Sequence, residues 1–263
     1  MYPTKYHRPA SLAEALKLLA DTEDAKLMAG GQTLIPTMKQ HLAAPAAVID
    51  LSRAGLSGIT NGGTLVTIGA MTTHAEVATS SEIAAVVPVL NTVAAGIGDP
   101  AVRHRGTIGG SISNNDPSAD YPAALLGLDA RIVTSTRELA AEDFFEGMFA
   151  TALDEGEIVT QVRVVQPKRA AYVKFPNPAS RYAMVGVMVA ETAGGIRVAI
   201  TGAGEDGVFR HEGLEEALSA SFSPDAVDGV EVSADGLLSD MHATAEYRAH
   251  LIKVMTRRAV AAC

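Results

Sequence analysis

The stretch that decides the fold of the N-terminal part is Lys26-Leu27-Met28-Ala29-Gly30-Gly31-Gln32-Thr33-Leu34. Its first four residues have the composition of a short strand, and two glycines follow this strand directly. Residues 34–42 then have a helical pattern, in which Pro36 is tolerated because it falls in the first turn. A strand that passes through glycines into a helix exposes backbone N–H groups at the positive end of the helix dipole, where phosphate oxygens bind.

The segments on either side complete a small α/β unit. Residues 11–20 predict a helix, because Ser11 and Glu14 have the spacing of a capping box ahead of a run of leucines. Residues 47–51 are apolar and predict a second buried strand. A strand, a loop, a helix and a strand in this order are typical of a small α/β unit.

A second glycine loop, Thr107-Ile108-Gly109-Gly110-Ser111, lies in a segment rich in Gly, Ser, Asn and Asp. Residues 106–120 show little periodicity, so we expect an ordered functional loop without regular structure. A single Gly-Gly pair is most often a tight turn. Two such loops instead predict a site for a dinucleotide pyrophosphate, because both carry hydroxyl or amide donors: Gln32, Thr33, Thr107 and Ser111.

A third glycine-rich string, residues 202–207, has the GxGxxG spacing of Rossmann nucleotide sites but predicts a plain loop. Glu205 and Asp206 would lie where a pyrophosphate must bind, and no apolar helix start follows them. This string is therefore rejected as a nucleotide site.

The rest of the chain predicts two further units that mix helices and strands. The turn Asn61-Gly62-Gly63 predicts a hairpin within residues 56–70. Helices are expected at 74–79, 83–95 and 121–128, and strands at 131–135 and 158–165. Beyond a boundary at 166–169, strands are expected at 171–175, 182–191 and 196–201, and helices at 214–220 and 244–262.

Composition excludes several classes of function. The chain has 263 residues and a formal net charge of -9, and such an acidic surface repels nucleic acid. The single cysteine, Cys263, rules out an internal disulfide and a cysteine-held iron–sulfur cluster or zinc site. The histidines have no metal-ligand spacing. No stretch has the length and apolarity of an integral membrane segment, and the first residues do not look like a signal peptide. We expect a cytoplasmic protein that could associate with the inner face of the membrane.

Four segments, in order, resemble the FAD-binding medium subunits of the molybdenum hydroxylases, the family of xanthine dehydrogenase and aerobic carbon monoxide dehydrogenase. Residues 28–39 and 106–122 resemble its two FAD loops, residues 174–183 its C-terminal signature and residues 246–259 its final helix. The resemblance covers essentially the whole chain and is greatest to the carbon monoxide dehydrogenase branch. Gln32-Thr33 replaces the His-Ser of some members, but both pairs keep hydrogen-bond donors.

The resemblance implies an α+β protein with a vanillyl-alcohol-oxidase (PCMH-type) FAD-binding fold. Two α/β subdomains, 1–55 and 56–165, would surround FAD, and 166–263 would form a smaller α+β domain. The pyrophosphate would be wrapped by the two glycine loops: Leu27, Met28, Ala29, Gly30, Gly31, Gln32, Thr33, Leu34, Thr107, Ile108, Gly109, Gly110 and Ser111.

The same resemblance places single residues elsewhere on the cofactor. Ile97 would pack near the flavin end, Asp120 would accept from an FAD hydroxyl, and Val159 would offer a backbone contact. Lys174 would lie near the isoalloxazine and Tyr182 beside the flavin ring, and Asn115 belongs to the second FAD motif.

From the residues alone, other interpretations of these positions stay open. A solvated surface lysine is the default interpretation of Lys174, and a core aromatic residue that of Tyr182. Asp120 is as consistent with a cap for the helix beginning at Tyr121 as with a contact to FAD. The basic cluster Arg103-His104-Arg105 could face the pyrophosphate or a partner, or form a solvated loop.

The resemblance finally implies an electron-transfer subunit without catalytic acid, base or nucleophile. A large subunit with molybdenum cofactor would oxidise the substrate, a small subunit would carry [2Fe–2S] clusters, and FAD here would pass electrons to a quinone or NAD. The heterotrimers would pair into dimers. The alternatives are a stand-alone flavin-dependent oxidoreductase and a FAD-free scaffold. The chain length leaves little room for a substrate pocket, and the donor loops argue against a scaffold.

Overall fold

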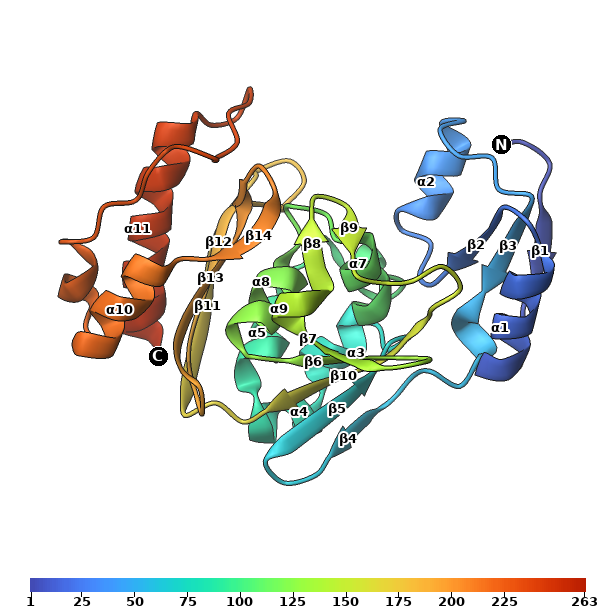
Figure 1. Cartoon of the computed structure of the whole chain (residues 1–263), viewed down its shortest axis with the longest axis horizontal. Helices are drawn as coiled ribbons and strands as arrows, with labels where there is room; N and C mark the ends of the chain where they lie inside the picture. Colours follow the sequence, from blue (N-terminus) through green and yellow to red (C-terminus); the bar gives the residue numbers. More distant parts are fainter.

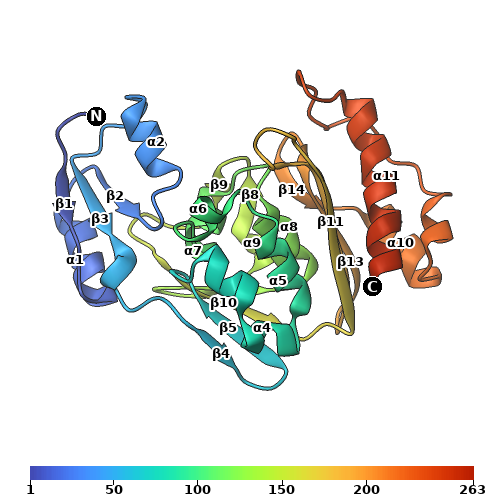
Figure 2. The same cartoon turned by 180° about the vertical axis from the view of Figure 1, so that it is seen from behind.

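The structure, a computed structural model that describes residues 1–263, contains three main β-sheets that follow one another along the chain (Figures 1 and 2). The N-terminus lies near one end of the long axis of the molecule and the C-terminus lies toward the other. Helices and strands are mixed throughout, which confirms the predicted α+β class. None of the helices is long and apolar enough to cross a membrane.

The first sheet is parallel, with the strand order β1 (Lys5–His7), β3 (Ala47–Asp50) and β2 (Ala25–Met28). Helix α1 (Leu12–Asp21) packs against it, and α2 (Leu34–Lys39) lies between β2 and β3 in the chain. The predicted helix, strands and glycine turn are confirmed, although α2 ends three residues before the expected position. Strand β1 was not predicted, because three residues are too few to show a period. A short 3₁₀ helix, η1 (Leu51–Arg53), leads out of this unit.

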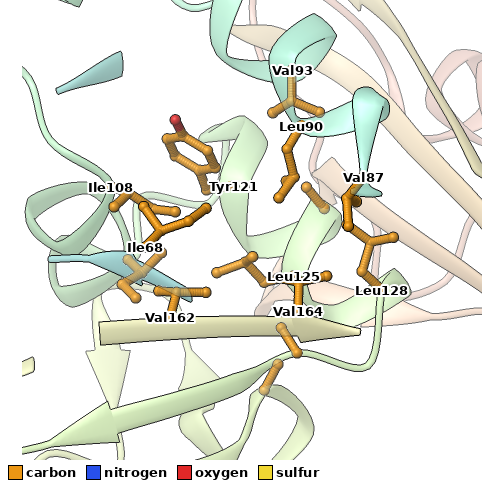
Figure 3. Close-up of a cluster of buried hydrophobic side chains, with 14 of the residues drawn as sticks. Ile68, Val87, Leu90, Val93, Ile108, Tyr121, Leu125, Leu128, Val162 and Val164 are labelled. Carbon is orange, nitrogen blue, oxygen red and sulfur yellow. The ribbon is translucent and has the colours of Figure 1, made fainter. Parts of the chain in front are cut away.

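The second sheet is antiparallel, in the order β4 (Ile59–Asn61), β5 (Leu65–Gly69), β10 (Val159–Val165), β6 (Arg131–Thr134) and β7 (Glu138–Ala140). Its core face is covered by α3 (His74–Thr79), α4 (Ser81–Val86), α5 (Pro88–Ala95), α7 (Ile108–Asn114) and α8 (Asp120–Gly127). Figure 3 shows this core, where Leu90 and Leu125 of the helices belong to the same apolar cluster as Ile68 and Val162 of the sheet. The shorter elements of this unit are α6 (Pro100–Arg103), α9 (Ala141–Phe144), β8 (Phe145–Gly147) and β9 (Ala150–Thr151).

Two predictions for this unit are wrong. Residues 83–95 do not form one helix, because the chain breaks at Val87 and Pro88 starts a new helix. Proline lacks the N–H that a continuous helix needs and disfavours helical backbone at the residue before it. Residues 106–120 are not irregular, since residues 108–114 form α7, which Thr107 caps by accepting from the N–H of Gly110. The glycines hid this helix, because their propensity is low and tertiary packing overrides it.

The third sheet is antiparallel, in the order β11 (Arg169–Pro176), β12 (Ala183–Thr192), β13 (Gly195–Gly204) and β14 (Gly207–Arg210). Helices α10 (Glu212–Ala220) and α11 (Ala245–Ala262) cover its outer face, together with η2 (Pro224–Val227). In strand β12, Val185 and Val187 pack in the cluster under α11, whereas Met188 packs in the central core. Both faces of the strand are therefore buried, which explains its uninterrupted apolar sequence.

The rejected GxGxxG string is a hairpin between two strands. Gly204 pairs with Gly207 across a turn formed by Glu205 and Asp206, and β14 follows where a Rossmann site would need a helix. The string is therefore a strand end, a turn and a strand start rather than a plain loop, and it lacks the helix that a nucleotide site needs.

Candidate functional site

A cavity of about 780 Å³ lies where the first unit faces the other two. Its volume falls in the range of small-molecule and cofactor sites. The lining comes from five separate parts of the chain, within residues 26–51, 70–74, 97–120, 153–159 and 180–182. The tertiary structure thus brings the two glycine loops, which are far apart in the sequence, together in one cavity wall.

The first glycine loop presents a row of free donors to this cavity. The backbone N–H groups of residues 29–34 make no hydrogen bond with any group of the chain. Gly31 has a φ of +74°, which lets the backbone turn from β2 toward α2, and all of residues 29–34 line the cavity. The side chains of Gln32 and Thr33 are exposed next to these amides. Successive unpaired N–H groups of this kind hold anions such as phosphates.

The second glycine loop offers fewer free amides than the first. The N–H of Ile108 donates to Thr72 O (3.1 Å), that of Gly109 to Ala70 O (2.8 Å) and that of Gly110 to Thr107 Oγ1 (3.1 Å). This loop therefore contributes the Ser111 side chain to the cavity and a packing surface for the first loop, rather than an amide cradle. Three of its N–H groups are already used to build α7 and to attach it to the segment that follows β5.

A buried ion pair reaches the cavity wall, because Asp120 lines the cavity and its partner Lys174 lies behind it. Asp120 is the first residue of α8 and accepts from Lys174 Nζ (2.9 Å) and from the hydroxyl of Tyr172 (2.5 Å). Lys174 Nζ also donates to Gly96 O (2.9 Å). Burial raises the pKa of the Asp120 carboxyl, against the opposing effects of Lys174 and Tyr172. Lys174 is neither solvated nor part of the cavity lining, and Ala119 rather than Asp120 caps α8.

Another carboxylate fixes the wall that contains Val159. The side chain of Glu157 accepts from the Thr134 and Thr136 hydroxyls, the Arg137 guanidinium and the Asp154 amide. Burial alone would raise the pKa of Glu157, but these hydrogen bonds lower it to about 2. The bend they close brings Leu153, Ile158 and Val159 to the cavity.

Tyr182 lies at the mouth of the cavity, on a loop that is held by hydrogen bonds of Asn177. The N–H of Asn177 donates to Tyr182 O, and its side-chain oxygen accepts from the N–H of Ala179 (2.9 Å). Tyr182 is 47% exposed, so its interpretation as a core aromatic residue is wrong. Partial burial and the charges of Asp116 and Asp120 raise the pKa of its hydroxyl.

The structure brings most of the predicted site residues to this cavity. The lining includes Leu27, Met28, Ala29, Gly30, Gly31, Gln32, Thr33, Leu34, Ile97, Thr107, Gly109, Gly110, Ser111, Asp120, Val159 and Tyr182. Three predicted residues lie outside it. Ile108 is packed in the core (Figure 3), Lys174 is behind Asp120, and Asn115 holds the β8–β9 hairpin by donating to Gly147 O and Ala150 O.

Sequence reasoning missed other lining residues, among them His74, Gly98, Gly106, Asp116, Glu157 and Arg181. Asp116 could have been found, because it lies inside the second motif, whereas a lone histidine or glutamate gives no signal in a sequence. In the basic cluster, Arg103 is tied to Ile97 O and Gly98 O, and His104 and Arg105 are exposed.

Comparison with known proteins agrees with this geometry. Residues 2–167 match the family described as FAD binding domain in molybdopterin dehydrogenase. The carbon monoxide dehydrogenase medium chain of Afipia carboxidovorans is 35% identical, over 97% of this chain and 94% of that protein. The nicotine 6-hydroxylase medium subunit of Paenarthrobacter nicotinovorans is 34% identical, over 97% and 95%. A solved structure of reconstituted CO dehydrogenase from Oligotropha carboxidovorans has a TM-score of 0.91 and 35% identity, over 98% of this chain and 96% of the other.

The family match covers more than half of the chain, and the similarity to these relatives extends over nearly all of it. The predicted PCMH-type FAD-binding fold is confirmed by the solved relative and by the family match. The chain therefore belongs to the FAD-binding subunits of molybdenum-containing dehydrogenases, which are multisubunit oxidoreductases, and its cofactor is FAD.

Proposed function

We propose that this chain is the electron-transfer subunit of its complex and that the cavity beside the first glycine loop holds FAD. The observation that carries the proposal is the row of backbone N–H groups at residues 29–34 without a partner in the chain. A dinucleotide pyrophosphate has the charge and the acceptor oxygens that such a row binds. When bound, FAD supplies redox chemistry that no side chain of the protein has.

The residues at the cavity divide into three tasks. The loop amides, together with Gln32, Thr33 and Ser111, would hold the pyrophosphate. Ile97, Val159 and Tyr182 would exclude water around the rest of the cofactor. Asp120 would accept from a polar group of FAD, held in place by Lys174 and Tyr172. Ile108 and Asn115 would act through the helix and hairpin that they fix. We keep the domains at 1–55, 56–165 and 166–263, because each main sheet falls within one of them.

The proposed partner subunits follow from the absence of cysteine ligands for an iron–sulfur cluster in this chain and from the complexes of its relatives. The only cysteine is Cys263, so [2Fe–2S] clusters would lie on a small subunit and the molybdenum cofactor on a large one. We propose a dimer of such heterotrimers in the cytoplasm, at the inner face of the membrane if the acceptor is a quinone rather than NAD. Relatives that differ in substrate, a CO dehydrogenase and a nicotine hydroxylase, are almost equally similar to this chain. The large subunit would therefore select the substrate, and carbon monoxide is one candidate.

The proposal is tested by expressing the chain with and without the large and small subunits proposed for its complex. We expect flavin absorbance in the purified complex, and bleaching of that absorbance by substrate only when all three subunits are present. The isolated chain should reduce no acceptor with any substrate of the complex. Turnover by the isolated chain would instead establish a stand-alone oxidoreductase, and a complex that stays colourless after reconstitution with FAD would overturn the proposal.

A further inference from the structure

His74 lies in the cavity wall beside the contact between the two glycine loops. It is the first residue of α3, after the capping residue Thr73, and its backbone N–H donates to Gly106 O (2.9 Å). The residue is 4% exposed and lines the cavity. A Cβ added to Gly106 would lie 2.5 Å from His74 Nε2, so the glycine at this position leaves that nitrogen uncovered.

Neither ring nitrogen of His74 has a hydrogen-bond partner in the chain, and Nδ1 is fully buried. On its core side the ring is tilted against Tyr121, with ring centroids 5.3 Å apart. The Tyr121 hydroxyl is also buried without a partner. It points away from the aliphatic side chains of the core in Figure 3. Buried polar groups are almost always paired, so an unpaired imidazole in a cofactor cavity calls for a partner that is not part of the chain.

The protonation state of the ring fixes what this partner must be. Burial, helped by the nearby Arg103 guanidinium, lowers the pKa of His74 to about 4, so the imidazole is neutral near pH 7 and carries one N–H. A buried donor without a partner is less tolerable than a buried acceptor. The proton therefore belongs on Nε2, beside Gly106, while Nδ1 stays an acceptor on the core side. Nε2–H needs an acceptor atom in the cavity.

We propose that His74 is an additional FAD-binding residue, whose imidazole donates from Nε2 to an oxygen of the cofactor beside the contact between the two glycine loops. The proposal rests on the proposed function, because it requires FAD in this cavity. It extends the site to α3, an element that neither glycine motif contains. It also explains why a residue with the burial of a core side chain carries a polar ring.

The test is a titration of the flavin-free full-length chain with FAD, followed by flavin fluorescence, for four variants. His74→Leu removes the donor. His74→Gln keeps an amide N–H near the position of Nε2, whereas His74→Asn keeps one only near Nδ1. Tyr121→Phe, next to the ring but outside the cavity lining, is the control for core packing. A hydrogen bond of ordinary strength predicts a Kd about 5- to 10-fold higher for His74→Leu and His74→Asn. His74→Gln and Tyr121→Phe should stay within about twofold of the unmodified chain.

Each other outcome contradicts a definite part of the argument. If all His74 variants bind FAD like the unmodified chain, or if His74→Gln is as weak as His74→Leu, the assigned hydrogen bond is absent. Melting temperatures without FAD separate a packing defect from a binding defect, because a binding role changes only the shift that FAD adds. Gly30→Ala, measured in parallel, tests the cavity itself. If that variant also binds normally, FAD lies elsewhere and the proposed function fails with its site.

Discussion

Gly30 in the first glycine loop packs directly on the carbonyl group of Arg105, just before the second loop. A Cβ at position 30 would lie 2.0 Å from Arg105 O and 2.8 Å from the Cα of Gly106. Gly110 likewise approaches Ala29, where an added Cβ would lie 3.0 Å from the alanine methyl group. The glycines thus serve first to bring the two loops together, and the contact holds the free amides of residues 29–34 at the cavity.

Gly30→Ala should therefore separate the loops. Because the clash is with backbone, the neighbour cannot rotate away, and overpacking of this kind costs about 1–3 kcal/mol. We expect FAD affinity to fall by about tenfold or more, measured as flavin bound per chain and as Kd. Gly229→Ala is the matched control, since an added Cβ there meets nothing within 4 Å. Equal flavin content in both variants would show that FAD does not bind at this loop contact.

The Asp120–Lys174 pair should show strong coupling in a double-mutant cycle. Asp120→Asn or Lys174→Met alone leaves the other charge buried without its partner, which costs about 3–5 kcal/mol. The double variant should be clearly more stable than the sum of the two losses predicts. Urea unfolding of the flavin-free chain measures all three free energies. Simple additivity would mean that the pair is not formed.

Glu157 should make the stability of the chain depend on acid pH. Its pKa is about 2 in the folded chain against an ordinary value of 4.5. The stabilisation is therefore complete above about pH 4.5 and is lost as the pH falls toward 2. Its upper limit is about 3 kcal/mol, reduced by solvent screening because Arg137 is partly exposed. Glu157→Gln should lower the free energy of unfolding at pH 7 and flatten its dependence below pH 4.5. The exposed Glu205→Gln is the control, and an unchanged acid profile in Glu157→Gln would contradict the assignment.

Among the arginines of α11, Arg248 should contribute most to the stability of the third unit. It is 3% exposed and donates to Met184 O, Gly202 O and Asp240, which joins α11 to β12, β13 and the preceding loop. Hydrogen bonds from a charged donor predict a loss of about 2–4 kcal/mol for Arg248→Met. Arg258→Met, on an exposed position of the same helix, should change stability by less than about 0.5 kcal/mol. Chemical denaturation distinguishes the two, and similar losses would refute the special role of Arg248.

Elements could be predicted from the sequence where the residues that stabilise them are close neighbours along the chain. The Ser11 cap, the turn at Asn61-Gly62-Gly63 and the apolar run of β12 were all visible in the sequence, because each depends on neighbours along the chain. Helix α7 was missed for the opposite reason. Its glycines have a low helix propensity, and it forms because Gly109 packs on Ala70 of another segment, where a Cβ would lie 2.5 Å away.

The site residues also divide into those with partners nearby in the sequence, which could be predicted, and those with distant partners, which could not. The amides of the first loop could be predicted, since a strand, two glycines and a helix in succession define their geometry. The amides of the second loop could not, because their partners, Thr72 and Ala70, lie more than thirty residues earlier in the chain. Lys174 and Asp120 were each singled out, but only the folded chain joins them across β11 and α8.

The sequence by itself determined the α+β class, the order of most elements, the first glycine loop and the family with its FAD. These follow from local backbone preferences and from motifs that are continuous in the chain. Only the tertiary structure decided that the second loop supports the first, that Lys174 lies behind Asp120 and that His74 reaches the cavity. Those relations join segments distant in sequence, and hydrogen bonding and close packing between such segments leave no periodic signal in either one.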